Sequence, residues 1–234
     1  RQVRSWFDSP ANTDETLDTI MSQIDSMQAP GDDHWFPVHA PVLIIPNVLS
    51  VEECQGLIHS FETGGPFLVK DSEKAKASGD YKMPIYEHDR QDRVDHMIKD
   101  TGIMEFLTER IASRINPMIK KAFSFEVNRR EDIHIARYVG KRGGHPMGHR
   151  DNTSPHVAYR RFALSMNLND DYEGGEIVFR GYNPHGYRGM PGTALIFSSS
   201  LLHEVQETTS GVRYNLISHL FSQSSAQQGP MAKR

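Results

Sequence analysis

The chain has 234 residues, of which 37% are hydrophobic, a formal net charge of −4 and one cysteine. This size fits one fair-sized domain, or one with an extra segment, and the mean hydropathy of −0.55 suits a soluble protein with an apolar core. The composition excludes an intrachain disulfide and a cysteine-based zinc site, and it argues against a broad basic surface for nucleic acid.

We recognise neither a membrane-spanning segment nor a signal peptide in this sequence. No run approaches the roughly 18 apolar residues of a membrane span, and no signal-peptide pattern opens the chain. We therefore expect a cytoplasmic protein that binds neither a membrane nor nucleic acid. Nothing in the sequence indicates its oligomeric state.

The first elements alternate between helical and irregular patterns. Residues 28–41, rich in Pro, Gly and Asp, predict a linker, and 42–46 (VLIIP) predict a short buried strand. Before them, residues 13–27 predict a helix, because apolar side chains recur at helical spacing at Leu17, Ile20, Met21, Ile24 and Met27.

A second helix is predicted after residue 50. Ser50 and Glu53 have the spacing of a capping box, and Gly64-Gly65 should end the helix. The polar residues 66–92 indicate a loop, either a solvated excursion or a substrate lid. Residues 93–123 look helical, with interruptions at 101–102 and at Pro117.

From residue 131 onward, short apolar runs alternate with Gly, Asn, Asp and Pro. These runs, which predict the strands of an all-β unit, are IHIARYV, RFALSMNL, GEIVFR, GTALIF and VRYNLISHLF. Because helices precede the strands, we expect an α+β protein with an all-β sandwich or jelly-roll core and helices packed outside it.

The stretch GHRDN contains a histidine and an aspartate separated by one residue. If it is extended, His149 and Asp151 project from the same side, whereas Arg150 points away. An imidazole and a carboxylate would then be aimed at one point, as a metal-ligand pair requires. Taken alone, the pair is equally consistent with a polar turn.

Two later residues favour the metal interpretation. His203 follows the apolar run TALIF, at the expected end of a strand, and supplies a third ligand. Two histidines and one carboxylate on one face suit non-haem Fe(II) and leave positions open. Arg213 begins a strongly apolar strand, where a buried cation needs an anion such as a dicarboxylate.

The predicted strand RFALSMNLN should have two different faces. The apolar face, expected to pack against helices, contains Phe162, Leu164, Met166 and Leu168. The opposite face is small and polar and suits the wall of a ligand cavity; it contains Ala163, Ser165, Asn167 and Asn169.

Three stretches together resemble the 2-oxoglutarate/Fe(II) oxygenases of the prolyl-4-hydroxylase type. They are RYVGKRGGHPMGHRDN, RRFALSMNLNDDYEGGEIVF and PGTALIFSSSLLHEVQETTSGVRYNLISHLF. The resemblance covers about residues 130–222, with a weaker likeness from VLIIPNVLSVEEC onward. It is strongest to bacterial members often found behind a peroxiredoxin-like domain, although the chain shows no thioredoxin motif.

The resemblance implies a double-stranded β-helix (jelly roll) over residues 126–222, flanked by N-terminal helices. It implies helical support over 36–125, a polar tail over 223–234, and a helix and linker over 1–35 that could end a missing upstream domain.

The resemblance also implies roles for particular residues. His149, Asp151 and His203 become iron ligands, and Arg213 becomes the partner of the distal carboxylate of 2-oxoglutarate. Tyr138 and Asn167 are expected at the same co-substrate, although many prolyl hydroxylases have tyrosine where this chain has Asn167.

Other polar residues are weaker candidates. Arg161, Asn152 and Arg150 are candidates for contacting substrate, but a solvated strand start is the favoured interpretation of Arg161. His145 is expected to be a loop histidine, and His219 a packed or surface histidine.

The expected activity is oxidative decarboxylation of 2-oxoglutarate coupled to hydroxylation of a C–H bond. It requires Fe(II) and O2, with ascorbate as a candidate reductant. The substrate would be a prolyl or other residue of a peptide or protein, with a free amino acid or small metabolite as the alternative. A non-catalytic jelly-roll module that binds a metal or dicarboxylate is a hypothesis of another class. A zinc hydrolase is disfavoured, because hydrolysis does not require Arg213.

Overall fold

The computed structural model describes residues 18, 21–22, 39–63, 68–70, 93–140 and 147–227. The chain divides into two units, residues 1–38 and 39–234. In the first unit the described residues, Asp18, Met21 and Ser22, are helical; the rest of the predicted helix over 13–27 lies outside the described residues. All other described residues lie in the second unit.

A large antiparallel sheet dominates the described part of the second unit. Seven strands follow the order β1-β10-β6-β12-β5-β3-β2, and β4 and β7 also pair with β12. The strand bounds are β1 (Leu43–Ile45), β2 (Leu68–Lys70), β3 (Arg93–Ile98), β4 (Arg129–Arg130), β5 (His134–Val139), β6 (Phe162–Asn167), β7 (Tyr172–Gly174), β10 (Ala194–Ser198) and β12 (Thr208–Phe221).

A second, smaller sheet has the order β11-β8-β9. Its strands are β8 (Ile177–Val178), β9 (Gly186–Tyr187) and β11 (Glu204–Val205). The strands predicted from residue 131 onward are therefore present, divided between two antiparallel sheets.

Helix α2 (Val51–Glu62) forms as predicted, because its first turn is capped in both directions. The Glu53 backbone N–H donates to Ser50 Oγ at 3.2 Å, and the Ser50 N–H donates to Glu53 Oε2 at 2.8 Å. The loss of such a cap typically costs about 1 kcal/mol. The helix buries Leu57 and Phe61, and the predicted stop at 64–65 lies outside the described residues.

The prediction of helix over 93–123 is wrong at its start. Residues Arg93–Ile98 form strand β3, which pairs antiparallel with β5. The helix begins at Thr101, where Asp100 caps it by accepting from the Ile103 N–H at 2.6 Å. The predicted interruption at 101–102 is therefore the helix start.

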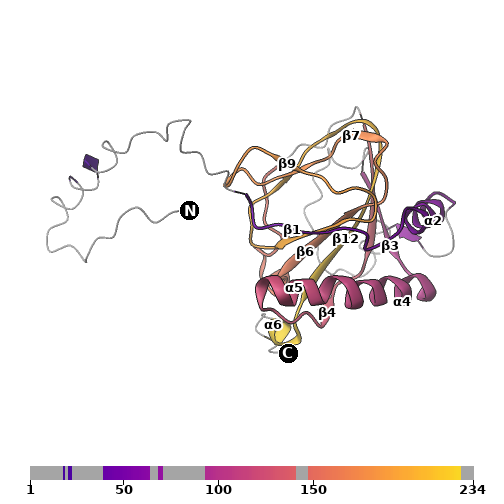
Figure 1. Cartoon of the computed structure of the whole chain (residues 1–234), viewed down its shortest axis with the longest axis horizontal. Helices are drawn as coiled ribbons and strands as arrows, with labels where there is room; N and C mark the ends of the chain where they lie inside the picture. Colours follow the sequence, from indigo (N-terminus) through magenta and orange to yellow (C-terminus); the bar gives the residue numbers. More distant parts are fainter. Residues whose placement is uncertain are drawn as a thin grey trace. The chain divides into compact units, whose positions relative to one another are not determined.

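The rest of this helix consists of α4 (Thr101–Arg110), a π-helical segment η3 (Ile111–Ile115) and α5 (Asn116–Phe123). Pro117 lies in the first turn of α5, where its missing N–H and its ring are accommodated by the wider turn before it. Figure 1 shows α4 and α5 running in line along the large sheet.

Two apolar clusters define the layers around the large sheet. On one face, Phe162, Leu164, Met166 and Leu168 pack with the helical residues Leu107, Ile111, Ile115 and Ile119, as predicted. On the other face, Ala163, Leu195 and Phe197 pack with Phe179 and with three residues of the small sheet, Ile177, Tyr187 and Val205. The large sheet therefore lies between helices and the small sheet.

Three further predictions are corrected or completed by the structure. Strand β1 forms, but Ile44 is 53% exposed, so this edge strand is not buried as expected. Within the predicted loop 66–92, Leu68–Lys70 form strand β2, and the rest of that range lies outside the described residues. The predicted polar tail begins with a short helix, α6 (Gln223–Gln227), that buries Ser225.

No described helix combines the length and the apolar character needed to cross a bilayer.

Candidate active site

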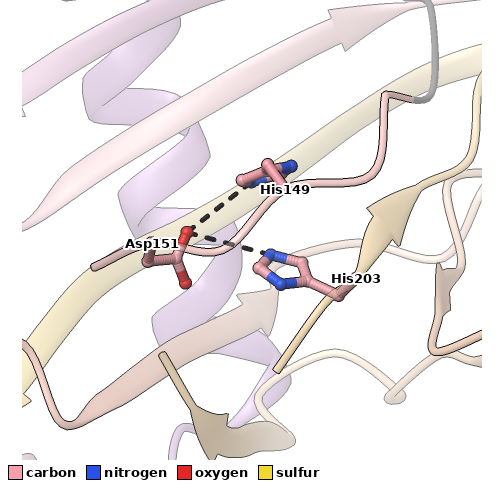
Figure 2. A group of neighbouring side chains, drawn as sticks. All are labelled: His149, Asp151 and His203. Carbon is pink, nitrogen blue, oxygen red and sulfur yellow. Dashed lines mark ion pairs between the residues drawn. The ribbon is translucent and has the colours of Figure 1, made fainter. Parts of the chain in front are cut away.

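The segment around His149 lies antiparallel to residues 199–203, and this pairing positions three side chains. The His149 N–H donates to the His203 carbonyl at 2.9 Å, and the His203 N–H donates back at 3.0 Å. Two residues on, the Asp151 N–H donates to the Ser199 carbonyl at 2.9 Å. Figure 2 shows the side chains of His149, Asp151 and His203 pointing toward one another.

The three side chains each offer one ligand atom within a small space. Nε2 of His149 lies 3.6 Å from Asp151 Oδ1, and Nε2 of His203 lies 3.8 Å from the same oxygen. All three ligand atoms are within 4.8 Å of one another. Metal–ligand bonds of roughly 2.1 Å require ligand atoms within about 4.2 Å, so small side-chain shifts close the set around one ion.

Both histidines are held in the orientation that presents Nε2. Nδ1 of His149 is 3.1 Å from the Met147 carbonyl, and Nδ1 of His203 is 3.0 Å from the Leu201 carbonyl. A carbonyl accepts only from a protonated Nδ1, so in each neutral ring the lone pair is on Nε2. This backbone contact at the second nitrogen is typical of metal-ligating histidines.

The surroundings of the triad differ between its two sides. The His203 side chain is 4% exposed and lies against Phe197, with ring centroids 4.8 Å apart. The His149 side chain is 52% exposed. The group therefore has one dry apolar wall and one open side through which further ligands can approach.

Electrostatics keep the carboxylate ionised and the buried imidazole neutral. Burial opposes the charge of Asp151, but attraction to His219, His203 and His149 outweighs it and holds the pKa below its ordinary value. For His203, burial lowers the pKa despite the nearby Asp151. An ionised carboxylate and a neutral imidazole are the protonation states that bind a metal.

Arg213, on β12, is 1% exposed and lies among polar and aromatic groups. Its Nε donates to Asn167 Oδ1 at 3.0 Å, and its guanidinium carbon is 5.1 Å from the centre of the Tyr138 ring. Its Nη1 has no hydrogen-bond partner among the described residues. A buried cationic donor without a partner is costly, and an anionic ligand would satisfy it.

Two further residues, Tyr172 and Gly175, border Arg213. A Cβ on Gly175 would lie 2.7 Å from Arg213 Cδ and 3.2 Å from Tyr172 Cε2, so glycine leaves the space that the arginine stem occupies. The Tyr172 hydroxyl is buried and has no hydrogen-bond partner among the described residues. Burial raises the pKa of this phenol, so it remains a donor. Tyr172 was not among the residues predicted from the sequence, since no pattern marked it.

The triad and Arg213 belong to one interior face. Arg213, Asn215 and His219 alternate along β12 and therefore share a side of the strand. His219 Nε2 lies 3.6 Å from Asp151 Oδ2. The same strand face thus connects the arginine at one end with the carboxylate of the triad at the other.

His219 is packed in the interior, one of the two alternatives expected from the sequence, and it lies next to two carboxylates. Its Nδ1 is 3.1 Å from Glu131 Oε2. Burial opposes the charge of Glu131, but the hydrogen bonds from His219 and Arg160 outweigh it and lower the pKa to about 2. The position of His219, an even number of residues after Arg213, could have indicated that it faces the interior.

The weaker candidates lie at the edge of this region. Arg150 and Asn152 both hydrogen-bond to Ser200, through its carbonyl and its hydroxyl respectively. Arg161 Nε donates to Ser225 Oγ at 3.1 Å, next to α6. Their role in substrate binding stays a prediction, and His145 lies outside the described residues.

No protein-family model matches the chain, and a search of curated proteins also gives no match. Solved structures do match. A prolyl hydroxylase from Trichoplax adhaerens, in complex with a hypoxia inducible factor oxygen degradation domain peptide fragment, is 14% identical; the match covers 92% of this chain and 93% of that chain, with a TM-score of 0.59.

Two other similar structures come from a bacterium and a virus. A 2OG-Fe(II) oxygenase family oxidoreductase from Burkholderia pseudomallei is 12% identical over 92% of this chain and 93% of its own, with a TM-score of 0.55. The viral collagen prolyl hydroxylase from Paramecium Bursaria Chlorella virus-1, as a 2OG complex, is 16% identical over 80% and 99%, with a TM-score of 0.55.

These similarities confirm the predicted fold. The chain has the jelly-roll fold of the 2-oxoglutarate/Fe(II) oxygenases, prolyl hydroxylases among them, with an antiparallel β core and helices on one face.

Proposed function

We propose that the chain is an Fe(II)- and 2-oxoglutarate-dependent dioxygenase that hydroxylates a C–H bond of a peptide or protein, with a prolyl residue as the first candidate. One observation carries the proposal. Two histidines with backbone-tethered Nδ1 atoms meet an ionised aspartate, and a buried arginine with an unsatisfied donor lies on the same interior face.

The three residues of the triad fit Fe(II). His149, Asp151 and His203 would occupy one face of the ion, as a two-histidine, one-carboxylate set does in non-haem iron sites. The exposed side next to His149 leaves room for the remaining ligands. When bound, the iron, 2-oxoglutarate and O2 supply the oxidation, which yields succinate, CO2 and a hydroxylated substrate.

The groups around Arg213 fit the distal carboxylate of 2-oxoglutarate. Arg213 Nη1 and the Tyr172 hydroxyl are two buried donors whose hydrogen bonds are unmade among the described residues. Asn167 accepts from Arg213 Nε and donates to the Gly189 carbonyl at 3.0 Å, so it orients the guanidinium. The Tyr138 ring covers one side of the guanidinium and limits its access to water.

The surface next to the exposed His149 supports a peptide substrate. Met147 and Leu202, each one or two residues from a triad histidine, are exposed apolar side chains. Exposed apolar groups at the mouth of a site suit a chain that lies across it. The similar structure from Trichoplax adhaerens holds a peptide fragment. A free amino acid or small metabolite is the alternative substrate.

The first test is anaerobic addition of Fe(II) and 2-oxoglutarate to the apoprotein, followed by the visible absorption spectrum. We expect a weak charge-transfer band that requires both additions. His149→Ala should abolish the band, and Arg213→Met should weaken it by raising the dissociation constant of 2-oxoglutarate. His59→Ala, an exposed histidine on α2, is the matched control and should behave as wild type.

The second test adds O2 and ascorbate and measures succinate with a panel of proline-containing peptides. Succinate formed with a peptide, and lost when its proline is replaced by alanine, would support prolyl hydroxylation. Succinate with free amino acids alone would favour the small-molecule alternative. A band without succinate across the whole panel would favour a non-catalytic module that binds metal and dicarboxylate.

A further inference from the structure

A partly buried polar network contacts Asp151 at two points. The first contact is at the side chain. Asp151 Oδ1 faces the two histidine ligands, whereas Oδ2 has no hydrogen-bond partner among the described residues. The group that faces Oδ2 is His219 Nε2, at 3.6 Å.

The second contact is at the backbone of the same residue. Arg160 Nη1 donates to the Asp151 carbonyl at 3.1 Å. The Asn152 side-chain amide donates to the Arg160 carbonyl at 3.3 Å, which joins the two segments on either side of η4 (Pro155–Val157). Arg160 therefore limits how far the backbone that carries the carboxylate can move.

Both contacts originate from one residue, Glu131. Its Oε1 accepts from Arg160 Nε at 2.6 Å, and its Oε2 accepts from Arg160 Nη2 at 2.8 Å and lies 3.1 Å from His219 Nδ1. The Tyr159 hydroxyl donates to Oε1 at 2.7 Å. One carboxylate thus holds the guanidinium in a bidentate pair and one nitrogen of the imidazole, whose other nitrogen faces Asp151.

The backbone of Glu131 is also fixed against β12. Its N–H donates to the His219 carbonyl at 2.9 Å, and its carbonyl accepts from Ser218 Oγ at 3.0 Å. The backbone of Glu131 is thus tied to β12 at His219 and Ser218, while its side chain holds His219 and Arg160. A hydrogen-bonded network of this kind has little freedom to rearrange, and buried networks specify one geometry when all members are satisfied.

We propose that Glu131 and His219 are positioning residues for the metal site: Glu131 holds His219 and Arg160, and these fix the side chain and the backbone of Asp151. The inference rests on the proposed function, since it requires that Asp151 ligate a metal. In this arrangement His219 contacts the oxygen of Asp151 that faces away from the other two ligands. Loss of the network would leave the three ligands present but poorly oriented.

The test measures metal binding by the full chain rather than turnover. Co(II) is titrated into apoprotein and followed by calorimetry and by its visible ligand-field spectrum, while thermal unfolding of the apoprotein reports folding. Glu131→Gln and His219→Gln should each weaken Co(II) binding by roughly 10- to 100-fold, the range for groups that orient metal ligands, and should change the ligand-field spectrum. Glu126→Gln, an exposed glutamate, is the matched control.

A double variant separates one connected network from two independent defects. If Glu131 acts through His219, the two changes are not additive. The variant that carries both Glu131→Gln and His219→Gln should then bind Co(II) no more weakly than the single variant with the lower Co(II) affinity. Additive losses would overturn that connection. Should Glu131→Gln fail to fold, His219→Gln decides by its affinity and spectrum alone.

Two outcomes would overturn the proposal, and they are distinguishable. In the first outcome, wild type binds Co(II) and His149→Ala does not, while Glu131→Gln and His219→Gln bind Co(II) with wild-type affinity but unfold at a lower temperature. The network then serves folding only. The metal site of the proposed function then stands without it. If wild type binds no divalent metal, both the proposed function and this inference fail.

Discussion

Replacing Gly175 with alanine should disturb the Arg213 pocket from within. Gly175 has φ +74°, in the left-handed region, where alanine costs about 1–2 kcal/mol of stability. For a domain of this size, that lowers the unfolding temperature by roughly 2–8 °C. The new Cβ would also lie 2.7 Å from Arg213 Cδ, closer than van der Waals contact allows.

The arginine stem cannot yield without moving its guanidinium. Nε is hydrogen-bonded to Asn167, and the Tyr138 ring lies over the guanidinium carbon. A displaced guanidinium loses a charge-assisted hydrogen bond worth about 1.5–3 kcal/mol. Gly175→Ala should therefore weaken 2-oxoglutarate binding by roughly ten- to a hundredfold.

The assay is calorimetric titration of 2-oxoglutarate into the Mn(II)-loaded protein, paired with thermal unfolding. Gly181→Ala is the control, because no heavy atom lies within 4 Å of its added Cβ and its φ is not positive. It should change neither measurement. If Gly175→Ala loses stability but binds 2-oxoglutarate with wild-type affinity, the reasoning that places the co-substrate against Arg213 is refuted.

Two further predictions concern folding stability. Gly56 lies within α2, and no atom lies within 4 Å of an added Cβ. Gly56→Ala should therefore raise the free energy of unfolding, measured in urea, by about 0.5–1 kcal/mol. A destabilised variant would contradict this prediction. The lowered pKa of Glu131 contributes stability that is fully present above its ordinary value of 4.5 and is lost as pH falls toward about 2. The difference in unfolding free energy between wild type and Glu131→Gln should therefore shrink by about 3 kcal/mol as the pH falls through this range. Urea unfolding midpoints at several pH values measure this difference. A difference that does not change with pH would count against the network.

Local patterns in the sequence were sufficient for much of the site. His149 and Asp151 are two residues apart in an extended segment, so their common direction follows from strand geometry alone. The same alternation separated the apolar side of β6 from the side that carries Asn167. The capping box of α2 was also readable, because all its groups lie within four residues.

Other features were not readable, because they depend on which strands become neighbours. Residues Arg93–Ile98 have a pattern compatible with a helix, and only pairing with β5 makes them a strand. The pattern could not anticipate that Pro117 would follow a π-helical segment within one continuous helix.

The sequence by itself predicted the chemical identity of the proposed site: two histidines, one aspartate and one arginine. Alternation along an extended segment aims His149 and Asp151 in one direction, and Arg213 lies on strand β12. Only the tertiary structure decided what surrounds them. Glu131 and His219 are 88 residues apart, and their contact depends on the register in which β12, which carries His219, pairs with β4, which ends one residue before Glu131. Alternation is a local property of the backbone, whereas strand register is selected by the packing of the whole core.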